Sequence, residues 1–280
     1  MAVLRWALRP FGWGVAPTPL LDQELNNTAV MRGIARVLAA RVRAEIERHG
    51  LVVADFWLDR LKDEIHFWLG YFATEGIEYG GRESIEAISR PHRFQFENLF
   101  SGLTRGSCVA VLDVGAGPIS RVGTLSENLR VTLRAVDPLA PAYDAILDLF
   151  SVVRPVPTEF GVAEHLLGRF TEGSFDLVHA RNALDHALDP LACIDQMARL
   201  VRPGGWIVLD HADREGDQQR FQGLHQWNLF VSGRQYQIED ASGRARTFDH
   251  EASGFSARFE PYVSDGKRCT RACFQRRGVT

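Results

Sequence analysis

The sequence lacks any uninterrupted apolar run that approaches the roughly 18 residues of a membrane-spanning helix. Its N-terminal apolar stretch is interrupted by Arg5 and Arg9, and a secretory signal peptide needs a longer apolar core than this. These absences predict a soluble, cytoplasmic protein that does not bind a membrane.

Cysteine is also scarce, with four residues in a chain of 280. They are too few and too scattered to form a disulfide scaffold, as expected of a reduced compartment. Cys269 and Cys273 have the spacing C-x3-C, but no second Cys or His pair lies near them in the sequence. The sequence therefore predicts neither a zinc site nor any other bound metal.

The sequence has no excess of basic charge, since 32 basic and 35 acidic residues leave a formal net charge of -3. This balance argues against a nucleic-acid partner. With 45% hydrophobic and 24% charged residues, the composition is that of a folded globular protein and excludes disorder as the main state. We expect a monomer or a homodimer that acts on a small molecule.

The first third of the chain, residues 1–104, is predicted to be a helical extension. Prolines and glycines in 10–20 indicate a loop, and a helix capped by Asn27 or Thr28 is expected to end near His49. The periodicity predicts a second helix over 52–73, followed by a loop over 76–93 with one short helix. The extension carries no cofactor motif, and its aromatic residues could form a lid over a pocket.

From residue 105 to the C-terminus we expect the cofactor-binding domain. Strands alternate with helices there, which predicts an α/β fold with a parallel sheet covered by helices on both faces. The predicted strands are 109–114, 131–136, 175–179 and 206–209, and the predicted helices include 139–150 and 190–201. Antiparallel strands at 236–238, 255–263 and 271–276 are expected to complete the sheet edge or to form a small cap.

The strongest local motif is a glycine turn that follows an apolar strand. Gly115 and Gly117 come directly after this strand, and the motif predicts a tight turn into a helix. Open α/β sheets bind ligands at the carboxyl ends of their strands. Asp137 lies twenty residues after Gly117, at the end of the next strand, where an acid can accept hydrogen bonds from both ribose hydroxyls of a nucleoside.

Two residues at this turn argue against a cofactor that contains a pyrophosphate. Ser120 stands where a dinucleotide motif has its third glycine, and Pro118 lacks the N–H that a phosphate would need. The P-loop motif is absent as well. The turn suits an uncharged or zwitterionic nucleoside better than a pyrophosphate, which argues against an NAD-dependent oxidoreductase.

Five segments in order resemble the motifs of the class I S-adenosylmethionine-dependent methyltransferases. They are 112–117, 135–138, 161–164, 175–186 and 200–209. The resemblance covers roughly the middle 40% of the chain and implies a Rossmann-like sheet, S-adenosylmethionine as cofactor and methyl transfer as the reaction. One departure is Val162, which replaces the aspartate that usually accepts the adenine amino hydrogen in this family.

The same resemblance implies the cofactor-binding residues of this chain. Arg181 and Asn182 are expected either to hold the methionine end of the cofactor or to form a structural turn. The full implied set is Asp113, Gly115, Ala116, Gly117, Asp137, Pro138, Leu139, Ala163, Glu164, Arg181 and Asn182.

A weaker resemblance joins the segment 223–228, together with His211, to small bacterial methyltransferases associated with saccharide or specialised-metabolite pathways. It implies that His225 and Trp227 line the acceptor pocket. Trp68, from the aromatic stripe of the second predicted helix, is a further candidate for substrate binding, although such a stripe also suits a core.

Methyl transfer to a hydroxyl oxygen benefits from a general base, whereas a neutral amine or a carbanion needs little help. His186 and His211 follow the two strands that end at the expected pocket, and they are the candidate catalytic bases. Asp185 is either a helix cap or a carboxylate of the pocket. The sequence thus favours O-methylation of a sugar or specialised metabolite. N- or C-methylation without a base, or a nucleoside-binding homologue without activity, stays open.

Overall fold

The computed structural model describes residues 28–76, 81–264 and 266–278. A seven-stranded sheet forms the centre of the molecule, with the strand order β3-β2-β1-β4-β5-β10-β9. Its parallel strands are β1 (Ser107–Val114), β2 (Leu129–Asp137), β3 (Thr158–Phe160), β4 (Phe175–Arg181) and β5 (Val201–Ala212). The antiparallel strands β9 (Phe255–Ser264) and β10 (Lys267–Arg276) complete one edge. The predicted Rossmann-like sheet is confirmed.

The strand register places the candidate residues together. Val114, the last residue of β1, pairs with Val136 of β2 and with Ala180 of β4, and both of these strands end one residue further on. Arg181, the last residue of β4, pairs with Asp210 near the end of β5. The carboxyl ends of four neighbouring strands therefore meet at one edge of the sheet. This edge carries the glycine turn and the start of each segment that follows β2, β4 and β5.

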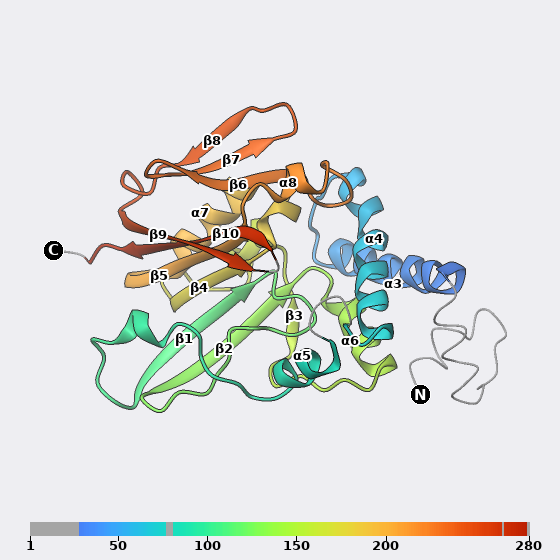
Figure 1. The fold of residues 1–280 in the computed structure, drawn as a ribbon, viewed down its shortest axis with the longest axis horizontal. Coiled ribbons are helices and arrows are strands. Elements are labelled where there is room, and N and C mark those ends of the chain that lie inside the picture. The colour runs from blue at the N-terminus through green and yellow to red at the C-terminus, as the bar shows by residue number, and fades with distance from the viewer. Residues whose placement is uncertain (1–27, 77–80, 265, 279–280) are drawn as a thin grey trace.

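One face of the sheet is covered by a helix, and the other face packs against Phe94, Phe96 and Phe100 through Val109 and Val111 of β1. The helix α7 (Pro190–Leu200) packs on the face that presents the even-numbered side chains of β1, such as Leu112 and Val114. The helices α3 (Thr28–Arg48), α4 (Asp55–Ala73) and α6 (Ala140–Leu149) share a second core and lie together at one end of the molecule (Figure 1). The short helices are α5 (Gly81–Ile88), α8 (Glu215–Gln218), η3 (Glu97–Phe100), η4 (Ala163–Gly168) and η5 (Leu184–His186).

The predicted helices 52–73, 139–150 and 190–201 are confirmed within a few residues. The predicted loop over 76–93 contains α5, as expected. Asn27 and the predicted loop over 10–20 lie outside the described residues. Among the residues that the structure describes, no helix combines the length and the hydropathy needed to cross a bilayer.

The prediction of a helix after Gly117 is wrong. Residues 115–128 are all described, and they form turns and a single bridge instead of a helix. The reason is a pairing with the segment 92–95. The N–H groups of Thr124 and Leu125 donate to the carbonyl of His92, and the carbonyl of Leu125 accepts from Phe94. These backbone groups are therefore not free to bond within a helix.

The sequence left open whether the C-terminal strands complete the sheet edge or form a small cap. The structure contains both arrangements. Strands β9 and β10 extend the sheet edge, whereas β6 (Trp227–Ser232), β7 (Gln235–Asp240) and β8 (Ala245–Phe248) form a separate three-stranded antiparallel sheet. This second sheet packs over the α7 side of the core and is drawn at the top of Figure 1. Strands β3, β6 and β8 were not among the predicted elements.

Candidate active site

The glycine turn links the ends of three strands. Gly115 and Gly117 have φ values of 65° and 66°, in the left-handed region that favours glycine. The N–H groups of Gly115 and Ala116 both donate to the carbonyl of Val136 at the end of β2, at 2.9 and 3.1 Å. A Cβ on Gly115 would lie 2.3 Å from the Cβ of Ala183, just beyond β4. No larger residue fits at position 115 without moving that segment.

Asp137 lies beside the turn with its carboxylate buried. Its two oxygens accept hydrogen bonds from the N–H groups of Gly117 at 3.0 Å and Leu139 at 2.8 Å. Burial raises the pKa of Asp137 to about 7, and these two backbone donors only partly oppose the shift. A buried carboxylate in this state is stabilised by any ligand that brings further hydrogen-bond donors to it.

The helix α4 lies over the glycine turn. The indole of Trp68 would be 3.4 Å from a Cβ placed on Gly117, and it packs edge-on against the ring of Tyr143 on α6. The indole N–H of Trp68 donates to Glu64, one helical turn earlier, at 2.9 Å. Burial and the nearby carboxylates of Asp137 and Glu64 raise the pKa of Tyr143 well above its usual value. A molecule bound along the turn would therefore contact residues of the N-terminal extension.

Asp113 is held inside the sheet. One of its oxygens accepts from the hydroxyl of Ser120 at 2.6 Å, and the other lies 2.7 Å from Nδ1 of His179 on β4. All three side chains are buried. Ser120, which departs from the dinucleotide motif, thus anchors the loop to β1. A contact between Asp113 and the cofactor stays a prediction.

The other predicted cofactor residues lie along the same edge. Asn182 has a φ of 43°, and its side chain accepts from the N–H of Ala212, so it ties the end of β4 to the end of β5. Glu164, on η4 after Ala163, accepts from the N–H of Leu188 at 2.8 Å. Pro138 follows Asp137 directly, and Arg181 is the last residue of β4. None of these contacts tests a role toward the cofactor.

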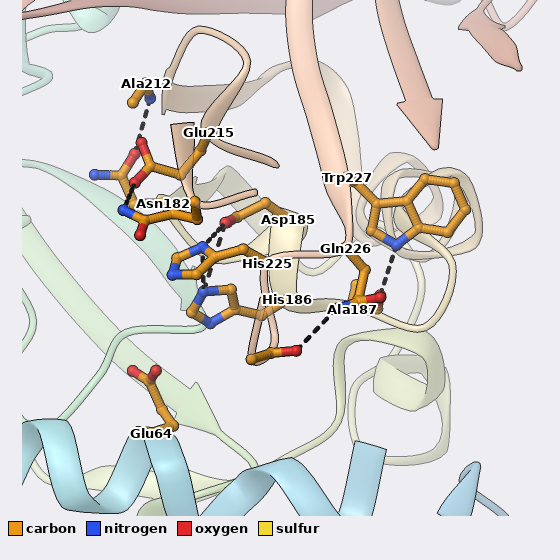
Figure 2. Close-up of polar contacts among 12 residues, drawn as sticks. Glu64, Asn182, Asp185, His186, Ala187, Ala212, Glu215, His225, Gln226 and Trp227 are labelled. Atoms are coloured by element: carbon orange, nitrogen blue, oxygen red, sulfur yellow. Dashed lines mark hydrogen bonds and ion pairs between the residues drawn. The ribbon is translucent and has the colours of Figure 1, made fainter. Parts of the chain in front are cut away.

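Three side chains meet just beyond β4 and form what we call the Asp–His–His cluster: Asp185, His186 and His225 (Figure 2). Nδ1 of His225 lies 2.6 Å from Oδ2 of Asp185 and 3.0 Å from Nε2 of His186. Nε2 of His186 lies 3.5 Å from the same Oδ2. The structure thus joins a predicted base and a predicted substrate residue with the carboxylate between them.

Asp185 supplies the negative charge of this cluster. It is buried, and although burial alone would raise the pKa of its carboxyl, His186 and His225 outweigh that effect and lower it to about 2. The residue is therefore ionised at neutral pH. Its burial next to His225 favours a role in the pocket over a helix cap, since Asp189 caps α7 instead.

Two tryptophans fix the segment that carries the cluster. The indole N–H of Trp57 on α4 donates to the carbonyl of His186 at 2.8 Å, and that of Trp227 donates to the carbonyl of Ala187 at 2.8 Å. The N–H of Gln226 donates to the carbonyl of Asp185. Trp227, predicted to line the pocket, thus begins β6 and positions the cluster through the backbone. Trp57 is one of the aromatic residues predicted to form a lid, but its bond to His186 was not foreseen, and no sequence signal indicated Glu64.

His211, the second predicted base, is enclosed. It is 4% exposed, and within the described chain neither of its ring nitrogens has a hydrogen-bond partner. Burial lowers its pKa to about 4, against the opposing charges of Asp185 and Asp210. His211 is therefore a neutral imidazole close to the cluster and outside its hydrogen bonds.

Replacing Trp57 by phenylalanine is expected to lower the free energy of unfolding by about 1 kcal/mol, because the hydrogen bond to the carbonyl of His186 is lost. NMR should show the imidazole resonances of His186 and His225 displaced, since the backbone that carries His186 is released. Trp206→Phe is the control, as Trp206 lies on β5 away from the cluster. Unchanged imidazole resonances in Trp57→Phe would contradict the positioning role.

Comparisons with known proteins show which family the chain is similar to. A family model described as a methyltransferase domain matches residues 59–241, more than half of the chain. A ubiquinone biosynthesis O-methyltransferase of Xanthomonas campestris is 37% identical over 108 residues, which are 37% of this chain and 43% of that protein. The protein of the same name from Hydrogenovibrio crunogenus is 28% identical over 145 residues, covering 50% and 55%.

The chain thus spans about half the length of the curated relatives that it matches. Among solved structures, a SAM-dependent methyltransferase of Methanosarcina mazei matches with a TM-score of 0.42 at 16% identity. That match covers 68% of this chain and 100% of the other. The family model extends from α4 to β7 and so includes the glycine turn, Asp137 and the Asp–His–His cluster.

Proposed function

The chain belongs to the methyltransferase-domain family of S-adenosylmethionine-dependent class I enzymes, and on this premise we propose that it methylates a hydroxyl oxygen of a small molecule. One observation carries the proposal. The glycine turn with its buried Asp137 and the Asp–His–His cluster follow neighbouring strands and lie at the same end of the sheet. This arrangement supports a nucleoside site beside a proton-accepting group.

The residues of the first of these sites fit S-adenosylmethionine. The buried carboxylate of Asp137 already accepts from the N–H groups of Gly117 and Leu139, and a carboxylate has further acceptor positions to which ribose hydroxyls could donate. Trp68 offers an aromatic surface 3.4 Å from the position of a Cβ on Gly117. When bound, S-adenosylmethionine supplies an electrophilic methyl group on a sulfonium.

The second site supplies what a hydroxyl acceptor requires. The methyl group must lie in line with the attacking oxygen, and the residues around it must exclude water. We infer that the imidazole of His186, beside the ionised Asp185, accepts the hydroxyl proton. The named activity of the relatives, O-methylation, also supports oxygen as the methylated atom.

The charges around the site favour a neutral or cationic small molecule as the acceptor. Glu64, Asp137 and Asp185 contribute acidic groups at this edge, and the chain carries a net charge of -3. A polyanion such as a nucleic acid would be repelled. Carboxylates and imidazoles are good partners for several hydroxyl groups at once, which supports a sugar or a specialised metabolite in the cytoplasm.

A metabolite extract incubated with the protein and isotopically labelled S-adenosylmethionine tests this proposal. Mass spectrometry is expected to reveal a labelled methyl ether on a small polyhydroxylated or phenolic compound, absent when Asp137→Ala protein is used. Label on nitrogen or carbon would contradict O-methylation. Cofactor binding by calorimetry without any labelled product from a wide extract would indicate a homologue that has lost transfer activity.

A further inference from the structure

We propose that the Asp–His–His cluster is a binding site for one divalent transition-metal cation. Oδ2 of Asp185, Nε2 of His186 and Nδ1 of His225 form a closed triangle with sides of 2.6, 3.0 and 3.5 Å. Ligand atoms bound at about 2.0–2.2 Å to one octahedral or tetrahedral cation lie roughly 2.9–3.5 Å apart. The triangle therefore needs only a small expansion of its shortest side to hold a cation.

Hydrogen bonds alone do not satisfy all three polar atoms of this triangle. Nδ1 of His225 carries at most one hydrogen, and at 2.6 Å that hydrogen belongs to the bond with Asp185. Nε2 of His186 then faces, at 3.0 Å, an N–H group that is already used. A hydrogen on His186 would instead point at a nitrogen without a lone pair, or reach the carboxylate over 3.5 Å. One cation at the centre satisfies all three atoms together.

The three ligands are held in place before any ion binds. Asp185 is 3% exposed, and its carbonyl accepts from the backbone of Gln226, which directly follows His225. Trp57 and Trp227 hold the backbone of His186 and Ala187 from two other elements. Ligands fixed by surrounding hydrogen bonds lose little freedom when a cation binds.

The ligand set determines the class of ion and leaves part of its coordination open. Two imidazoles and one carboxylate suit zinc, iron, cobalt, nickel or manganese better than magnesium or calcium, which prefer oxygen ligands. Three protein ligands leave further positions for water or substrate. Glu64 points from α4 toward the side on which the two imidazoles lie (Figure 2).

The role of the cation rests on the proposed function, whereas its binding does not. A cation with open positions would take the acceptor hydroxyl as a ligand and lower the pKa of that hydroxyl. The proton would pass to water, and the oxygen would use the electron pair that it keeps to bond the methyl carbon. The carbon–sulfur bond of the sulfonium would break at the same time and leave its electron pair on sulfur. The cation would then replace the imidazole of His186 as the group that makes the hydroxyl acidic.

Titration of the chelator-stripped full chain with Co²⁺, followed by the visible absorption of the bound ion, tests the site. We expect one equivalent to bind, and Zn²⁺ to displace it. His186→Ala and His225→Gln are each expected to weaken binding at least about 100-fold, because one of three protein ligands is lost. His165→Ala, an exposed histidine outside the cluster, is the matched control. Circular dichroism checks that each variant is folded.

Absence of Co²⁺ binding to the stripped protein, or equal binding by the folded cluster variants and the control, would overturn the proposal. Calorimetry of S-adenosylmethionine binding in the presence of chelator tests the proposed function separately, because that affinity depends on Asp137. Undiminished methyl transfer by chelated protein would overturn the catalytic role of the cation. Transfer restored by one equivalent of Zn²⁺, Mn²⁺ or Co²⁺ would support that role.

Discussion

Asp137→Asn is expected to lower the affinity for S-adenosylmethionine by at least about 100-fold in isothermal titration calorimetry. Two hydrogen bonds from ribose hydroxyls to a carboxylate contribute about 1.5–3 kcal/mol each. The asparagine keeps one acceptor oxygen, but its amide would point N–H donors at the backbone N–H of Gly117 or Leu139. Both the charge and the geometry of the site are therefore lost. An affinity within a factor of three of the wild-type value would show that Asp137 does not bind the cofactor.

The same carboxylate is expected to make cofactor binding depend on pH. Burial sets the pKa of Asp137 at about 7 in the free protein, and the cofactor hydroxyls bind its ionised form. Affinity should therefore rise as the pH increases toward 7 and become constant above it, by up to tenfold per unit on the rising part. Calorimetry in two buffers of different ionisation enthalpy should show proton release below pH 7. In Asp137→Asn this dependence should vanish.

The stability of the protein should change in the opposite direction. Because the folded-state pKa of Asp137 lies above its usual value of 3.8, the stability contribution is fully present below about pH 4 and is lost as the pH rises through 7. The shift of about three units corresponds to roughly 4 kcal/mol at most. Urea unfolding should therefore show that the free energy of unfolding of Asp137→Asn, relative to that of the wild type, increases from pH 5 to pH 8. An equal difference between the two proteins at both pH values would contradict a pKa of about 7 for Asp137.

The elements that the sequence predicted well depend on local patterns. The apolar run before Gly115 and the acid at position 137 define β1, β2 and the turn between them, because glycine at positive φ and a carboxylate at a strand end are local requirements. Helices with a clear apolar periodicity, such as α4, were predicted to within three residues at each end. The parallel sheet follows from the order of these elements.

The rest depends on contacts between remote segments. The helix expected after Gly117 is replaced by pairing of residues 122–125 with 92–95, which no periodicity reveals. His225 joins Asp185 across 40 residues, and Trp57 reaches the carbonyl of His186 across 129. Each histidine could be identified as a candidate from its position, but their mutual distances are set by the path of the chain from β5 to β6.

His186→Ala is expected to reduce turnover on the true acceptor by about 10²–10⁴-fold, while the affinity for S-adenosylmethionine changes less than threefold. A positioned proton acceptor contributes a factor of this size to attack by a hydroxyl, and the cofactor contacts assigned to Asp137 and the glycine turn are left intact. His165→Ala, exposed and outside the cluster, should keep full turnover in the same assay.

The cluster also predicts how a second substitution behaves. Because His186 and His225 share the carboxylate of Asp185, we expect His186→Ala/His225→Gln to be little slower than either single variant, as for groups that act as one unit. If the losses of turnover in the two single variants multiplied in the double variant, the two imidazoles would act independently. If only His211→Ala lost turnover, the enclosed imidazole of His211 would be the base. Full turnover in all of these variants would require an acceptor that needs no proton removed, a nitrogen or carbon nucleophile.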